Sequence, residues 1–305
     1  MLALTVQSDL TSVGPGIFRM GVTAADQVSA LVGFAMDALE ARRFAVLYPK
    51  DAFGIEYKNL FWDEVERRGG RMVGIEGYDP AEVDIQNEIR KLVGLYYVTP
   101  DESVRIEKRD RLSRRREQNR EALAAPELAD LPPYVDFDAL FIPDVAAKVG
   151  VILPQLRFYD VADVALLGTR DWNDAKLVEL AAQEAEDSIF VDAFNAASDD
   201  PRVKEFVAAY YAAYGVAPDA YAAQGYETAS LLRELVSRSR AAPTSAELTQ
   251  DIRLFKERVP DFRAVAGLRS FDAVGGSVRD LAVLTVKRRQ IRDYDRAPAV
   301  KNKGR

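Results

Sequence analysis

The chain has 305 residues, 48% of them hydrophobic and 29% charged, which is enough for two domains of about 150 residues or one two-lobed unit. Its 41 lysine and arginine residues against 48 aspartate and glutamate residues give a net charge of −7, which argues against nucleic-acid binding. Histidine and cysteine are both absent, which excludes a Ser-His-Asp triad, a thiolate nucleophile and a zinc site of imidazole or sulfur. Binding without catalysis is therefore the leading class, while carboxylate, lysine or tyrosine chemistry and oxygen-ligated Mg²⁺ or Ca²⁺ stay open.

The first residues, MLALTVQSDLTSVGPG, are not typical of an export signal, because they lack a basic start and their apolar run is short. No run of roughly 18 apolar residues occurs anywhere, so we expect no membrane-spanning helix. The absence of cysteine fits an exported protein and a reduced cytosolic one equally well, and it does not decide the compartment.

Helix and strand patterns alternate along the chain up to about residue 196. Apolar residues at helical spacing are followed by short β-branched or aromatic runs, and turn residues such as Pro49 and the pair Gly69-Gly70 separate them. The predicted helices cover about 28–39, 53–65, 84–92 with Asp84 as its cap, and 149–156, and the predicted strands cover 44–48, 72–78, 138–142, 164–167 and 188–194. This alternation predicts an α/β fold with a doubly wound, mostly parallel sheet covered by helices on both faces.

The chain becomes rich in helix from about Pro201. The predicted elements of this part are helices over 203–214, 220–240 and 245–257, and a two-stranded hairpin formed by 268–271 and 281–286. Gly215 is expected to end the first of these helices. Residues 296–305 hold four basic residues and no acidic one, and we expect a disordered tail over 295–305.

The segment 98–133 breaks this rhythm. Its charges alternate in sign with little apolar face, and a structureless stretch of this length inside an α/β layer is uncommon. We interpret it as an inserted, solvent-exposed helix or loop. The alternative is a docking surface for an acidic partner or a membrane, which the cluster Arg114-Arg115-Arg116 favours.

Several short strings stand in an informative order, although none is specific alone. They are Phe18-Arg19 followed by Asp26-Gln27, FAVLYPKDAFG over 44–54, Gly69-Gly70 before a strand that ends in Tyr78, FDALFIPD over 137–144, LGT over 167–169, and Phe271-Asp272 before a glycine turn. In this order and spacing, over about residues 1–294, the chain resembles the Leu/Ile/Val-binding branch of the type I periplasmic binding proteins. It is also similar to the penicillin-binding-protein activators, which share that fold.

The resemblance implies a two-lobed α/β fold in which each lobe is a doubly wound, mostly parallel sheet. It divides the chain into residues 1–20 with 197–265 for the first lobe, 21–196 with the insertion 98–133 for the second, and 266–294 as a hairpin that crosses back at the hinge. Members of the family begin with further β-α units, so we expect an incomplete first lobe that exposes a sheet edge and apolar surface.

The resemblance also implies a ligand between the lobes, held by loops that follow the strands. The implied ligand-binding residues are Thr5, Gln7, Ser8, Phe53, Gly54, Asp144, Thr169, Arg170, Asp171, Trp172 and Tyr226, with Gln224 beside the last of them. Arginine and tryptophan together suit a carboxylate, a phosphate or a sugar face. Other roles stay open: Phe53 can anchor a helix, Asp144 can cap a helix, and Arg170 can form a surface ion pair. No metal and no cofactor is expected.

The departures from the family pattern bear on the ligand. Amino-acid binders of this family hold the ligand ammonium with an acid near the first crossover and another after the Leu-Gly strand, where this chain has Ala24 and Arg170. An arginine repels an ammonium, and like charges side by side cost on the order of several kcal/mol. We therefore expect a small polar or anionic, amino-acid-like solute in place of a standard α-amino acid.

Two functions follow from the resemblance. The first is a periplasmic, non-enzymatic solute-binding component of an ABC importer, whose partners are a small solute and a membrane permease, with no nucleic acid. The alternative is a regulator that docks on a peptidoglycan synthase, which the charged insertion favours. A third possibility, an enzyme acting through carboxylates such as Asp171 and Asp174, has little support without histidine or spaced metal ligands.

Overall fold

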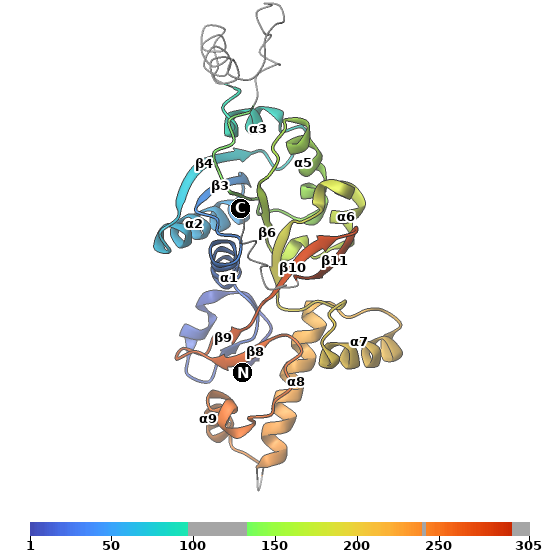
Figure 1. Cartoon of the computed structure of the whole chain (residues 1–305). Helices are drawn as coiled ribbons and strands as arrows, with labels where there is room; N and C mark the ends of the chain where they lie inside the picture. Colours follow the sequence, from blue (N-terminus) through green and yellow to red (C-terminus); the bar gives the residue numbers. More distant parts are fainter. Residues whose placement is uncertain (97–132, 240–241, 295–305) are drawn as a thin grey trace, which may run out of the picture.

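The structure, a computed structural model, describes residues 1–96, 133–239 and 242–294. The predicted charged insertion, apart from Pro133, and the predicted tail over 295–305 lie outside these residues. The described helices and strands form a large lobe around a seven-stranded sheet and a small lobe with two two-stranded sheets, one below the other in Figure 1.

The sheet of the large lobe is mostly parallel. Its strands are β3 (Arg43–Pro49), β4 (Arg71–Tyr78), β5 (Ala139–Phe141), β6 (Ala165–Gly168), β7 (Ile189–Asp192), β10 (Ala282–Lys287) and β11 (Gln290–Asp293). They lie in the order β11-β10-β7-β6-β5-β3-β4. Strands β3 to β7 run parallel, whereas β10 is antiparallel to both of its neighbours. The predicted α/β fold with a mostly parallel sheet is confirmed in this lobe.

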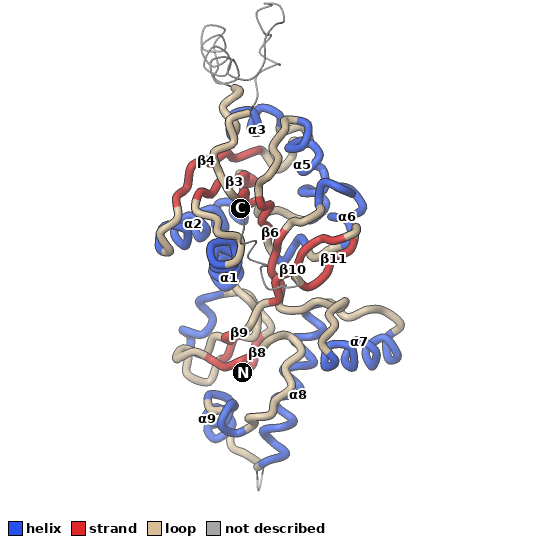
Figure 2. The backbone as a smooth tube through the Cα atoms, viewed as in Figure 1, coloured by secondary structure: helices blue, strands red, loops and turns tan. Residues whose placement is uncertain are grey.

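Helices cover both faces of this sheet (Figure 2). On one face lie α1 (Ala24–Asp37) and α2 (Ala52–Arg67), and on the other lie α3 (Gln86–Leu92), α5 (Ala146–Phe158) and α6 (Ala175–Ala181). Along β3, Phe44 and Val46 pack with α1 and α2, whereas Ala45 and Leu47 pack with the other layer. Successive side chains of a strand point to opposite faces, so this central strand is apolar on both sides.

The small lobe is built mainly from helices. Its elements are β1 (Leu2–Ala3), the 3-10 helix η1 (Ser8–Val13), β2 (Phe18–Arg19), α7 (Pro201–Tyr214), α8 (Ala220–Arg238), α9 (Ser245–Arg253), α10 (Phe255–Arg258), β8 (Leu268–Phe271) and β9 (Ser277–Arg279). Strands β1 and β2 are parallel, β8 and β9 are antiparallel, and a bridge between Arg19 and Gly276 connects the two pairs. Within the described residues this lobe therefore has two short sheets where the resemblance implied a doubly wound one.

Side chains at the helix ends explain where several helices begin and end. The hydroxyl of Thr23 accepts a hydrogen bond from the Asp26 N–H while the Asp26 carboxylate accepts one from the Thr23 N–H, a capping box that starts α1. Gly215 adopts a left-handed φ of 71° and ends α7, as predicted. Helix α3 begins at Gln86, because Asp84 accepts a hydrogen bond from the Gln86 N–H in a turn before the helix instead of capping it.

The predicted terminal hairpin is wrong in its second strand. Strand β8 pairs with β9, which covers Ser277–Arg279, and not with residues 281–286. The turn closes early because Asp272 Oδ1 accepts hydrogen bonds from three successive backbone N–H groups, at residues 274–276, and because Gly275 takes a φ of 102° that favours glycine. The residues predicted as the partner instead form β10, which pairs with β7 in the large lobe.

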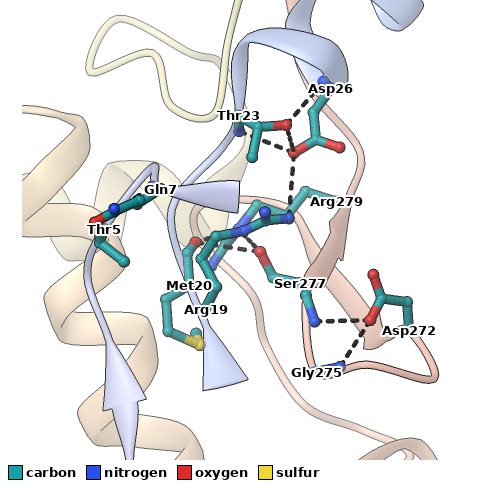
Figure 3. A network of polar contacts seen from close by, with 11 residues as sticks. Thr5, Gln7, Arg19, Met20, Thr23, Asp26, Asp272, Gly275, Ser277 and Arg279 are labelled. Carbon is teal, nitrogen blue, oxygen red and sulfur yellow. Dashed lines mark hydrogen bonds and ion pairs between the residues drawn. The ribbon is translucent and has the colours of Figure 1, made fainter. Parts of the chain in front are cut away.

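Three segments of the described chain connect the lobes, at residues 20–23, 193–200 and 280–281. An ion pair between Glu227 of α8 and Arg279 lies where segments 20–23 and 280–281 leave the small lobe. The side chains of Glu227 and Arg279 are 0% and 2% exposed. Figure 3 shows Arg279 and Ser277 turned toward Met20. Arg279 Nε donates to the Met20 carbonyl over 3.0 Å, and the Ser277 hydroxyl donates to the same oxygen over 3.2 Å.

Further backbone groups complete this ion pair. Glu227 Oε1 accepts hydrogen bonds from the N–H groups of Ala266 and Leu268 over 3.0 and 3.3 Å. Arg279 Nη1 donates to the Ala266 carbonyl over 2.6 Å. The pair thus joins α8, the start of β8 and two of the three connecting segments, those at residues 20–23 and 280–281, at a single buried point.

Replacement of Phe61 tests the core of the large lobe. The Phe61 ring is fully buried and stacks on Phe141 with centroids 4.3 Å apart, so Phe61→Ala should lower the free energy of unfolding by about 3–5 kcal/mol. Phe158 is 79% exposed, and Phe158→Ala should change it by no more than about 0.5 kcal/mol. Urea unfolding of the two variants measures both values, and equal losses would contradict this core.

Replacement of Arg279 tests the buried ion pair. Arg279→Met leaves the Glu227 charge buried without a partner and should cost about 3–5 kcal/mol of unfolding free energy. Adding Glu227→Gln removes that charge and should restore more than half of the loss. As a control, Arg269 pairs with Asp280 at the surface over 3.0 Å, and Arg269→Met should cost at most about 1 kcal/mol. A double variant less stable than Arg279→Met would refute the charge argument.

Candidate functional site

Polar side chains gather at the edge of the large sheet where its parallel strands end. Strands β5, β6 and β7 are neighbours, and Asp144, residues 169–171 and Asp192 stand at or just after their carboxyl ends. Ligands of open α/β sheets bind at this edge. Tyr221, in the first turn of α8, reaches the same place from the small lobe.

Arg170 connects the two lobes at this edge. Its Nη2 donates to the Tyr221 hydroxyl oxygen over 2.6 Å, and its guanidinium carbon lies 5.2 Å from the centre of the Tyr221 ring. Its Nε lies 3.9 Å from Asp171 Oδ1, at the outer limit of an ion pair. The guanidinium is therefore placed by one carboxylate of its own lobe and by one ring of the other.

A buried amide fixes the backbone below Arg170. The Arg170 N–H donates to Gln27 Oε1 over 3.0 Å, and Gln27 Nε2 donates to the Tyr57 hydroxyl over 2.9 Å. Burial, and next the charge of Asp171, raise the pKa of Tyr57, so its hydroxyl keeps its proton. This chain of contacts ties the short 3-10 helix η3 (Arg170–Trp172) to α1 and α2.

A cavity of about 440 Å³ opens beside Arg170 between the lobes, within the range of roughly 300–1,000 Å³ that ligand sites occupy. Its polar lining comes from both lobes and from the connecting segment 193–200, and consists of Arg170, Asp171, Asn173, Asp192, Asn195, Asp219 and Tyr221. In the part of the chain that the structure describes, no three acidic side chains are arranged to hold a metal ion.

Asp192 is the most buried acid of this cavity, with 5% of its surface exposed. Burial raises its pKa to about 6, although hydrogen bonds from Asn173 Nδ2 and the Ala193 N–H and the charge of Arg170 act in the opposite direction. Burial also raises the pKa of Asp171, against the lowering effect of Arg170. Both carboxylates are thus poorly solvated and favour a positive partner.

The structure places three of the predicted binding residues at this site. Arg170 and Asp171 line the cavity, and Thr169 caps η3 by accepting a hydrogen bond from the Asp171 N–H. Trp172 does not reach the cavity and is a correction: its ring is fully buried, and its Nε1 donates to the Ile142 carbonyl over 3.1 Å. Gly168 makes room for that ring, since a Cβ there would lie 2.1 Å from it.

Phe53, Gly54 and Asp144 have structural partners. The ring of Phe53 packs on Tyr57 at 4.6 Å between centroids, which is the helix-anchor alternative. Gly54 is buried where a Cβ would lie 2.1 Å from the Pro49 carbonyl, so this position needs glycine for close packing. Asp144 accepts a hydrogen bond of 2.6 Å from the Tyr78 hydroxyl, and the cap position of α5 is Val145, so Asp144 is not its cap.

The remaining predicted residues lie apart from the Arg170 contacts. The Gln7 N–H donates to Thr5 Oγ1 over 3.2 Å in the loop after β1, which Figure 3 shows at the side of the Arg19 and Met20 segment. Ser8 is exposed at the start of η1. Gln224 is buried, and Tyr226 packs on Phe206 at 4.7 Å and lines a separate cavity of the small lobe.

Sequence reasoning missed Asp192, Asn173, Asn195 and Tyr221. Asp192 ends β7 at the same edge as the predicted residues, whereas the predicted strand ran on to residue 194; with the strand end placed correctly, the rule that found Asp144 would have found Asp192. Tyr221 carried no comparable signal, because its contact with Arg170 joins residues 51 positions apart.

Two lobes joined by three segments, with a polar cavity between them at the carboxyl ends of parallel strands, define a class of hinged binding proteins. A family model described as a periplasmic binding protein matches residues 136–290. This match covers just over half of the chain, and the chain belongs to the periplasmic binding protein family. The resemblance found in the sequence is thereby confirmed.

Several solved structures with a similar fold carry the names of transporter proteins. A structure assigned to a branched-chain amino acid ABC transporter of Rhodospirillum rubrum has a TM-score of 0.72 and 20% identity, over 95% of this chain and 71% of that one. The branched-chain amino acid transporter substrate-binding protein of Streptococcus pneumoniae, in complex with isoleucine, has a TM-score of 0.61 and 19% identity, over 94% and 68%. An ABC transporter substrate-binding protein of Desulfitobacterium hafniense, in complex with Leu, has a TM-score of 0.61 and 21% identity, over 96% of this chain and 72% of that one.

No curated protein matches the chain. The family match and the similar structures give no support to the alternative of a penicillin-binding-protein activator. None of the helices in the described residues combines the length and the hydrophobicity that crossing a membrane requires.

The pKa of Asp192 predicts a pH-dependent effect of Asp192→Asn. Since this pKa is about 6 in the folded chain and 3.8 ordinarily, the folded chain binds more protons between these values, and wild-type stability from this group falls as pH rises through them. The difference between the two pKa values corresponds to about 3 kcal/mol of folding stability, which is fully lost above the pKa of the folded chain. The Tm of Asp192→Asn minus that of wild type should therefore increase between pH 4 and pH 7.5.

A hydrogen bond lost in Asp192→Asn would change the Tm difference between variant and wild type by the same amount at every pH. The slope of this Tm difference against pH therefore reports the titration of Asp192 alone. Asp163→Asn, at an exposed acid of the same lobe, is the matched control and should give a flat difference. A flat profile for Asp192→Asn would mean that Asp192 titrates like an exposed carboxylate.

Proposed function

We propose that this protein is the solute-binding component of an ABC importer, that it acts in the periplasm, and that it performs no catalysis. Its two lobes close on a small amino-acid-like solute in the cavity beside Arg170. The observation that carries the proposal is the contact from Arg170 to Tyr221, because it joins the two lobes at a cavity lined by residues of both.

The chemistry of this contact suits a solute with a carboxylate. A guanidinium has five N–H donors, and Arg170 uses one nitrogen on Tyr221. The Tyr221 hydroxyl accepts that hydrogen bond and keeps its own proton for donation. A carboxylate lying beside this pair would receive charge-assisted hydrogen bonds from the free N–H groups of Arg170 and a neutral one from the Tyr221 hydroxyl. A solute that bridges the lobes in this way stabilises the closed arrangement over the open one.

Family membership and the fold support the same role. Two of the similar structures named above are transporter substrate-binding proteins in complex with isoleucine or leucine. Delivery of a bound solute requires a membrane permease as partner, and this permease belongs to the proposal.

Ligand-dependent stabilisation tests the function. A thermal-shift titration with leucine, lysine, glutamate and succinate should give a saturable rise in Tm for at least one solute, since a ligand at 100 times its Kd adds about 2.7 kcal/mol. Arg170→Ala should abolish the rise and Tyr221→Phe should weaken it. Arg157→Ala removes an exposed arginine at the end of α5 and should leave it unchanged. No rise in a folded wild-type chain would refute the role.

A further inference from the structure

The charge of Arg170 is already balanced inside the protein. Asp171 lies 3.9 Å from its Nε, and the Tyr221 ring and hydroxyl oxygen take up one side of the guanidinium. A solute carboxylate can still reach this group. It does not find an uncompensated positive charge there.

Two further carboxylates line the same cavity, those of Asp192 and Asp219. Arg170 is the one cationic side chain among the described lining residues, against three acids. The lining therefore carries two excess negative charges when all three acids are ionised. Asp192 contributes most to this excess, because it is buried and its field is weakly screened by water.

The amide donors of the cavity are already used. Asn173 Nδ2 donates to Asp192 Oδ2 over 2.9 Å and to the Phe194 carbonyl over 3.2 Å. Asn195 Nδ2 donates to Asp293 Oδ1 over 2.7 Å. The groups that face the cavity are thus mainly acceptors, and a solute that donates hydrogen bonds and carries positive charge complements them.

We infer that the solute of this cavity has more ammonium than carboxylate groups, as a diamino carboxylic acid such as lysine has. This inference rests on the function proposed above and names the substrate class of the same site. The solute carboxylate lies beside the contact between Arg170 and Tyr221, and its ammonium groups face Asp171, Asp192 and Asp219. This class differs from the anionic solute expected from the sequence, because the neighbours of Arg170 outweigh its charge.

The inference predicts the direction of proton exchange on binding. The charged groups around Asp192 are Arg170 and Asp171 from η3, Asp219 from the start of α8, and Asp293 of β11 across Asn195. An ammonium entering among them lowers the pKa of Asp192, which then releases its proton at about pH 6. An anionic solute would raise that pKa and cause proton uptake.

Isothermal titration calorimetry at about pH 6, in two buffers with different ionisation enthalpies, measures this exchange. We expect lysine to bind at least tenfold more tightly than leucine or glutamate, with release of a fraction of a proton. Asp192→Asn should weaken lysine binding at least tenfold and abolish the proton release. Asp163→Asn, the matched loss of an exposed acid, should change neither.

The outcomes separate the two proposals. Tighter binding of leucine or glutamate than of lysine, or proton uptake with lysine, would overturn the cationic class and leave the solute-binding function standing. Unchanged lysine affinity in Asp192→Asn would also overturn the cationic class. Absence of binding by any of the three solutes to a folded chain would overturn the proposed function, and the cationic class with it.

Discussion

The buried ion pair between Glu227 and Arg279 holds the small lobe together at the point where two of its three connections to the large lobe begin. Removing two charges from water costs several kcal/mol for each, and proteins tolerate it only where attraction and further hydrogen bonds compensate. The compensation here comes from backbone groups of separate segments, at Met20, Ala266 and Leu268. Because two of the three connecting segments start at this point, the pair that completes the small lobe also fixes where those connections begin.

This constraint limits what can move when the lobes close. Arg279 and Ser277 both donate hydrogen bonds to the Met20 carbonyl and hold this residue in the small lobe. We therefore expect the hinge to bend at residues 21–23 and in the longer segment 193–200. Gly21 is no free pivot, since a Cβ there would lie 2.1 Å from the Thr5 carbonyl. Asn195 ties the middle segment to β11 of the large lobe. The position of Tyr221 relative to Arg170 is therefore set by a few residues of backbone.

The sequence was sufficient for the large lobe because each of its elements carries a local pattern, such as the apolar run of β3 and the stop at the glycine pair after α2. It was insufficient for the terminal hairpin, because two strand-like runs compete for β8 and the turn at Asp272 decides between them. At the site, a strand end predicted Arg170 and Asp171. Trp172 follows directly in the chain, yet nothing local says that its ring turns back to the core. The place of Tyr221 at the site depends on how the two lobes pack against each other, and no short sequence pattern encodes that packing.

Arg170 also explains why one charge along a chain is a poor guide to a ligand. When the sequence is compared with the family pattern, Arg170 stands where amino-acid binders have an acid, and this single change predicts that the site repels an ammonium. In the fold, acids from η3, β7 and the start of α8 face the same cavity, and the potential there is the sum over all of them. Burial raises the pKa of Asp192 to about 6 although the charge of Arg170 lowers it, so this carboxylate is poorly solvated where it faces the cavity. A solute must complement the summed potential of the cavity, and this potential is negative although Arg170 itself is positive.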